Sequence, residues 1–485
     1  MKKIITKDNK FLFLLTIFIL FVVHLPLFYK NIISADILLN NYLYKGYSWE
    51  ISLGRFGLYI VGLIKSYLNI PCIDLVISFV IISISSILLI DLFDIKSKLN
   101  KTLFILFICV SPVVSATLLF NYCSIGYLIS FLCGILSVYI FYKVNNKFSK
   151  YLIPIILIVV SLSMYQAYLS LIITFFVIYN IKLLLDNNFK YMEFFKYLIC
   201  LVIGVILYFI TMKLSLYVFH ISISNYSNAD KIGINTLINI PDKIIDSYKF
   251  FYNYYFTDSI MKNTYMHNNY LNLLVFILLV INLFIYFYKS STDRKNIVII
   301  ILLLLLLPIF LNSIIFVIND SKLQLLMSMS YIMVIVLLLS INNFKIKYIS
   351  LIILIFLLRN YLIQDQATYL SLEHTFNTYY NVIDIALKND VDNINKKYII
   401  IGEVKNNSDI NKRNYGFISD DSIFWDEYNL RKIAFEKFTD EYFGIKLEFG
   451  SEYLYNKLLK NSSNDLIYNY DNNIVINLNN YKKNS

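Results

Sequence analysis

The chain has 485 residues, of which 58% are hydrophobic and only 15% are charged. Soluble domains carry about 25% charged residues, whereas apolar stretches of about 20 residues, long enough to cross a bilayer, recur along most of this chain. This composition excludes an ordinary soluble protein, and the solid apolar runs exclude the alternating pattern of a membrane β-barrel.

The net charge of +11 is distributed in a pattern typical of a membrane protein. Lysines form short clusters between the apolar runs, as in cytoplasmic loops that face anionic lipid, so we expect membrane lipids and no nucleic acid as partners. The five cysteines and four histidines show no metal-ligand spacing. Asp420 and Asp421 are carboxylates of the kind that bind a divalent cation, but such pairs are more often solvated turns. We therefore predict no metal site and no cofactor.

The first long apolar run, from Phe11 to Phe28, predicts a retained helix that begins in the cytoplasm, because four lysines precede it. An outer loop is predicted at about 30–70, and a long Tyr-rich outer loop at about 220–270. Ten further spans are predicted: one at about 71–93, two within 102–142, two within 151–185, and single spans at 197–219, before 289, before 319, at 323–344 and at 348–363. The total of about 11 spans places the C-terminal region outside, and a miscount by one at Ser161–Ser170 would place it inside.

The composition becomes more polar from about residue 364. Residues 364–390 have helical spacing, and "KKYIIIGEV" and "NNIVINL" have the apolar character of buried strands. "LRKIAFEKFTDEYFGI", which lies between these strands, has the spacing of an amphipathic helix. We therefore expect a transmembrane domain over 1–363 and a small extracytoplasmic α/β domain over 364–485.

The first outer loop carries residue types that suit sugar chemistry. Asp36 and Glu50 are carboxylates that can take a proton from an acceptor hydroxyl. The Trp49 ring can stack on a sugar, and Arg55 can hold a phosphate leaving group in a bidentate fork. An interfacial belt is the alternative interpretation, because Trp and Tyr collect at membrane surfaces. The residues alone leave both interpretations open.

The order of these features resembles the glucosyl transferase II family, whose bacterial and phage members decorate O-antigen and related surface glycans. The family's acidic pair, Gly, Trp and Gly–Arg elements are matched here by Ala35–Asp36, Gly46, Trp49 and Gly54–Arg55. Further similar segments are "SPVVSATLLFNY" from Ser111, the pair Tyr165–Gln166, and the triplet Phe424–Trp425–Asp426. Ala35 replaces the family's first acid, so the resemblance carries only the second acid over to this chain.

The resemblance implies an all-α, polytopic, GT-C-like glycosyltransferase of the bacterial cytoplasmic membrane. Such an enzyme would move a hexose, by the family's label glucose, from a polyprenyl-phosphate donor to a cell-surface polysaccharide on the outer face. Direct displacement with a single base would invert the anomeric centre. The expected roles are general base for Asp36, with Glu50 as the fallback; donor phosphate binding for Arg55, Lys322 and Arg359; and sugar or acceptor contact for Trp49, Tyr165, Gln166, Trp425 and Asp426.

Two other functions are compatible with a polytopic chain. A transporter or flippase for lipid-linked sugars usually shows internal repeats, broken helices and midplane charges, and few such charges and no repeat are evident here. A glycan polymerase or ligase would also have many spans and a large outer loop, for which residues 226–270 are the candidate.

Overall fold

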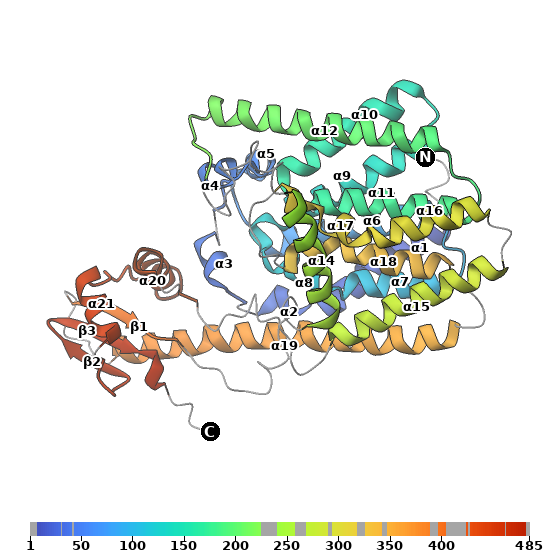
Figure 1. The fold of residues 1–485 in the computed structure, drawn as a ribbon. Helices are drawn as coiled ribbons and strands as arrows, with labels where there is room; N and C mark the ends of the chain where they lie inside the picture. The colour runs from blue at the N-terminus through green and yellow to red at the C-terminus, as the bar shows by residue number, and fades with distance from the viewer. Residues whose placement is uncertain are drawn as a thin grey trace. The chain divides into compact units, whose positions relative to one another are not determined.

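The computed structural model describes residues 7–30, 32–40, 43–224, 240–257, 268–289, 293–317, 325–341, 347–388, 396–403, 423–424, 427–460 and 462–481. The chain is mostly helical and has one small sheet near its C-terminal end (Figure 1). The elements in chain order are α1 (Lys7–Val23), α2 (Pro26–Tyr29), α3 (Ala35–Leu39), α4 (Ser48–Ser52), α5 (Phe56–Ile64), α6 (Pro71–Leu92), α7 (Lys98–Cys109), α8 (Pro112–Leu119), α9 (Asn121–Lys143), α10 (Lys147–Met164), α11 (Tyr168–Leu185), α12 (Tyr191–Val218), α14 (Ile240–Phe256), α15 (Asn268–Lys289), α16 (Arg294–Leu305), α17 (Leu307–Leu311), η2 (Ser313–Phe316), η3 (Leu325–Tyr331), α18 (Ile332–Ile341), α19 (Lys347–Lys388), β1 (Lys397–Ile401), α20 (Tyr428–Phe443), α21 (Glu452–Lys460), β2 (Ile467–Tyr470), β3 (Asn473–Asn477) and η5 (Leu478–Asn480).

Within the described residues, seven helices are long and apolar enough to cross a membrane: α6, α9, α10, α11, α12, α15 and α19. The bent pair α7–α8 makes an eighth if it counts as one span, with a bend of 41° at Ser111–Pro112. Pro112 begins α8 without an amide hydrogen to donate, which is why the helix breaks there. These helices make the chain a multi-pass membrane protein.

Three predicted spans are shorter than a full membrane-spanning helix or are interrupted. The first predicted span corresponds to α1, which has only 17 residues. The span predicted before residue 319 is divided into α16, α17 and η2, with Pro308 at the start of α17, and the span predicted at 323–344 begins as a 3-10 helix. Proline and short 3-10 segments are common causes of such breaks.

The structure corrects one sequence expectation and joins two others. Residues 240–256, expected within a long loop, form the helix α14, whose buried face includes Phe250, Tyr254 and Tyr255. The helix α19 has 42 residues, from Lys347 to Lys388, so the span predicted at 348–363 and the helical spacing predicted for 364–390 belong to one continuous helix. No Gly or Pro interrupts this stretch. The change from apolar to polar side chains alters the surroundings of the helix but not its backbone preference.

The chain divides into two compact units. The first contains Met1–Leu25 and most of Tyr42–Leu362, and its central helices α9 and α11 are largely buried. Small residues permit close helix packing in this unit. The Oγ atoms of Ser130 on α9 and Ser161 on α10, for example, lie 3.0 Å apart.

The second unit combines Ile363–Ser485 with Pro26–Asn41 from the beginning of the chain. Its sheet has the order β1-β3-β2, with β1 parallel and β2 antiparallel to β3. The two predicted strands are thereby confirmed as β1 and β3, and the predicted amphipathic helix is confirmed as α20. The sequence did not predict β2, α21 or the inclusion of Pro26–Asn41.

Candidate functional site

A tight turn between α4 and α5 brings the predicted functional residues Glu50 and Arg55 together. Gly54 adopts φ +81°, a left-handed conformation that favours glycine. A Cβ atom on Gly54 would lie 2.7 Å from both Met212 Sδ and Tyr208 Oη. The turn also closes with a 2.8 Å hydrogen bond from the Arg55 amide to the Glu50 carbonyl. Gly54 therefore allows the loop to approach α12 closely and to direct the residues on either side of it.

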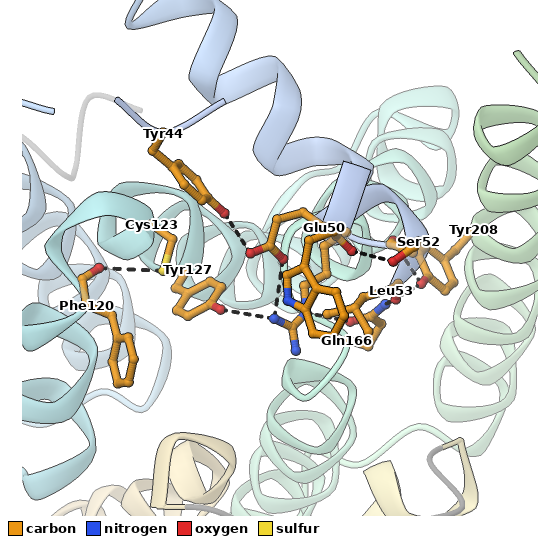
Figure 2. Close-up of polar contacts among 12 residues, drawn as sticks. Tyr44, Glu50, Ser52, Leu53, Phe120, Cys123, Tyr127, Gln166 and Tyr208 are labelled. Atoms are coloured by element: carbon orange, nitrogen blue, oxygen red, sulfur yellow. Dashed lines mark hydrogen bonds and ion pairs between the residues drawn. The ribbon is translucent and has the colours of Figure 1, made fainter. Parts of the chain in front are cut away.

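The Arg55 guanidinium has polar and aromatic partners from three parts of the first unit. Figure 2 labels three of these partners, Glu50, Tyr127 and Gln166. Arg55 Nη1 is 3.4 Å from Glu50 Oε2 and 3.3 Å from Tyr127 Oη, and its Nε donates to Gln166 Oε1 at 3.4 Å. The guanidinium also lies over the Tyr165 ring, 5.2 Å from its centroid, which is within the range of a cation–π contact. Helices far apart in the sequence therefore converge on this one cation.

Glu50 is a buried carboxylate with both oxygens engaged. Oε2 faces Arg55, and Oε1 accepts a 2.8 Å hydrogen bond from Tyr44 Oη. Burial, followed by the Glu50 charge, raises the pKa of Tyr44 well above its ordinary value, so Tyr44 stays protonated as a donor. Burial by itself lowers the pKa of Arg55, but Tyr127 and Glu50 outweigh this and raise it. Arg55 therefore stays protonated, and its charge is paired with the Glu50 carboxylate.

The Tyr165–Gln166 pair occupies the break between α10 and α11. Gln166 Nε2 donates to the Leu53 carbonyl at 2.5 Å and to Tyr208 Oη at 2.9 Å. The Tyr165 ring stacks on Tyr127, with centroids 4.3 Å apart and planes at 26°. The pair therefore fixes the backbone of the α4–α5 turn as well as the Arg55 side chain.

The structure brings together only part of the predicted site. Glu50, Arg55, Tyr165 and Gln166 form one cluster. Of the other predicted residues, Trp49 is 54% exposed on α4, Arg359 is exposed on α19, and Asp36 is exposed on α3 in the second unit. Lys322, Trp425 and Asp426 lie outside the described residues.

Sequence reasoning missed two tyrosines that complete the cluster, Tyr127 and Tyr208. The chain has 42 tyrosines, so neither of these stood out by residue type. Tyr127 and Tyr208 also lie inside apolar helices, where an aromatic side chain is expected simply to pack. For metal binding, no group of three or more His, Cys, Asp or Glu residues with suitable placement occurs within the described ranges.

Replacing Gly54 with Ala is expected to lower both the stability of the detergent-solubilised protein and its activity. The left-handed conformation costs an L-residue about 1–2 kcal/mol, and the new Cβ would also displace the Tyr208, Met212 and Gln166 side chains. The matched control is Gly444→Ala, since Gly444 also has a positive φ but has open space at its Cβ. Thermal unfolding should show the larger loss for Gly54→Ala, and equal losses would contradict the crowding at the turn.

The comparisons with known proteins give one family. The family model for glucosyl transferase GtrII matches residues 25–341. This range includes the α4–α5 turn and the Tyr165–Gln166 pair, whereas Arg359 and the Phe424–Asp426 segment lie beyond it. No curated protein and no solved structure matches the chain significantly. Because the matched range covers well over half of the 485 residues, the chain belongs to the glucosyl transferase GtrII family.

Proposed function

We propose that this membrane glucosyltransferase takes glucose from a polyprenyl-phosphate donor and adds it to a cell-surface polysaccharide on the outer face of the bacterial cytoplasmic membrane. Family membership and the long apolar helices support a membrane glucosyltransferase. The outward direction follows from the lysine-rich segment before α1, which favours the cytoplasm. Nucleotide sugars are confined to the cytoplasm, so an outward-facing enzyme needs a lipid-borne donor.

The observation that carries the proposal is the way in which the Arg55 guanidinium is hydrogen-bonded. Its Nε and Nη1 atoms are held by Gln166, Glu50 and Tyr127, while Nη2 has no hydrogen bond to any part of the chain that the structure describes. The side chain is 19% exposed. A guanidinium whose Nε and Nη1 are held by the protein keeps Nη2 as the donor for a phosphate oxygen. We assign the donor phosphate to Arg55, and we keep Lys322 and Arg359 as additional candidates for the same role.

The reaction that follows is a direct displacement. The acceptor hydroxyl oxygen forms a bond to the anomeric carbon of glucose, the bond from that carbon to the phosphate oxygen breaks, and polyprenyl phosphate leaves. A carboxylate takes the hydroxyl proton, and Arg55 stabilises the negative charge that develops on the phosphate. Attack from the side opposite the leaving group inverts the anomeric centre.

We assign the general base to Asp36. Its carboxylate is on an exposed residue, whereas both oxygens of Glu50 are engaged inside a buried cluster. Glu50 then acts as a positioning residue for Arg55, and remains the second choice for the base. Trp49, which is exposed on the same loop as Arg55, is the candidate platform for a sugar ring, and Trp425 and Asp426 remain proposed acceptor contacts.

The test compares the surface polysaccharide of a strain lacking the gene with that of a strain complemented by the native chain. We expect one glucose side branch to be lost and then restored. Membranes that contain the native chain should transfer glucose from glucosyl polyprenyl phosphate but not from UDP-glucose. Lipid-linked sugar that accumulates on the inner leaflet would instead indicate a flippase, and a change in polysaccharide chain length would indicate a polymerase or ligase.

A further inference from the structure

The short helix that carries Asp36 is built into the C-terminal unit. Although α3 lies early in the chain, it packs against α20 (Figure 1). Ile33 and Leu38 belong to the same hydrophobic core as the C-terminal residues Phe376, Phe435 and Phe438. Leu38 is fully buried there. About 340 residues or more separate the two parts of this core along the chain.

Two polar contacts also hold this segment in the C-terminal unit. Lys437 Nζ on α20 donates to the carbonyl of Leu39, the last residue of α3, at 2.9 Å. Lys30 Nζ forms an ion pair with Glu373 Oε2 on α19 at 2.5 Å. A cation at the carbonyl end of a helix is favourable because these carbonyls have no partner within the helix.

A helix of five residues does not persist in water by itself. Its conformation must therefore come from the unit that it packs against. Ala35, Ile37 and Leu38 are buried in this packing, and Asp36 is exposed. The C-terminal unit consequently determines which side chain of α3 is presented outward, and that side chain is the carboxylate.

We propose that the C-terminal unit is a working part of the transferase, which holds α3 and thereby sets the position of Asp36, with Lys437 as a positioning residue. This inference rests on the proposed function, because it takes Asp36 as the general base. Residues 363–485 lie entirely beyond the range that the family model matches. The inference assigns them the role of positioning Asp36.

The experiment uses the full-length protein in detergent or nanodiscs with three variants. Lys437→Met removes the hydrogen bond to α3, and Lys437→Arg retains a donor of similar length. Lys432→Met is the matched control, since Lys432 lies on the same helix and likewise faces a glutamate four residues later, at 4.0 Å. Among the described residues, the hydrogen bond from α20 to Leu39 comes from Lys437 and not from Lys432. Hydrogen exchange of the peptide spanning residues 30–43 is measured together with kcat and with KM for the lipid donor.

For Lys437→Met we expect faster exchange at the Leu38 and Asn40 amides, which donate hydrogen bonds within α3. We also expect kcat to fall by about tenfold or more at nearly constant KM, because misplacing a reacting group reduces the rate without weakening donor binding. Lys437→Arg should restore most of the rate, and Lys432→Met should leave exchange and rate unchanged.

Two results would overturn the inference. Unchanged exchange in Lys437→Met would mean that the C-terminal unit does not hold α3 through this contact. Faster exchange with native kcat would mean that the position of α3 has no part in the reaction. A native chain that transfers no glucose would refute the proposed function separately, and the exchange measurement would still decide whether the unit holds α3.

Discussion

Replacing Asp36 with Asn is expected to reduce glucose transfer by about 10²–10⁴-fold, the range that a general base contributes. The substitution keeps the shape of the side chain and removes its ability to take a proton. Because Asp36 is exposed and its neighbours Ala35 and Ile37 make the buried contacts, the protein should reach the membrane in native amounts. The rate is measured in membranes supplied with glucosyl polyprenyl phosphate, and the protein amount by immunoblot.

The control for this variant is Asp440→Asn, which removes another exposed carboxylate from the same unit. It should retain the native rate. Full activity in Asp36→Asn would refute the assignment of the base, and Glu50→Gln would then be the next variant to measure. Because Glu50 also holds Arg55, that variant must be compared at equal amounts of folded protein.

Replacing Arg55 with Ala is expected to affect both catalysis and stability. Loss of a charged group that stabilises a leaving phosphate reduces the rate by about 10²–10³-fold. The substitution also leaves Glu50, whose side chain is 8% exposed, without its cation. Breaking such a buried pair from one side costs about 3 kcal/mol. Both the rate of transfer and the thermal unfolding temperature should therefore fall.

A double variant separates these two effects. In Arg55→Met with Glu50→Gln, no unpaired charge remains in the cluster, so stability should return while transfer stays absent. Arg55→Lys keeps the positive charge without the planar fork and should retain an intermediate rate. Arg294→Ala, at an exposed arginine at the start of α16, is the neutral control. Recovery of transfer in the double variant would show that Arg55 has only a structural role.

The spans could be predicted from the sequence because their signal is local. Apolar runs between lysine-containing segments located α6, α9, α10 and α11 to within a few residues, whereas α12 begins six residues before the predicted span at 197–219. Apolar character predicted the first part of α19, and the helical spacing of residues 364–390 predicted the rest. The association of Leu38 with Phe435 could not be predicted, since contacts between distant residues leave no local pattern.

The candidate site was predicted in its parts but not in its geometry. The order of the motifs pointed to Arg55 and Gln166, which lie 111 residues apart and share a hydrogen bond in the structure; their roles in the reaction stay predictions. The order of the motifs could not show that both carboxylate oxygens of Glu50 would be bound, one by Tyr44 and the other by Arg55. The choice between Asp36 and Glu50 as general base therefore became sharper only once burial and hydrogen-bond partners were known.

Pro26–Asn41 and the C-terminal residues belong to one compact unit with a shared hydrophobic core, so we expect them to lie on the same side of the bilayer. The chain between them must consequently cross the membrane an even number of times. If α7–α8 counts as one span, eight candidate spans lie between the two segments, which is an even number. If Leu325–Ile341 also crosses the membrane, one more crossing is needed to keep the number even. The broken stretch Arg294–Phe316 is the candidate for that crossing.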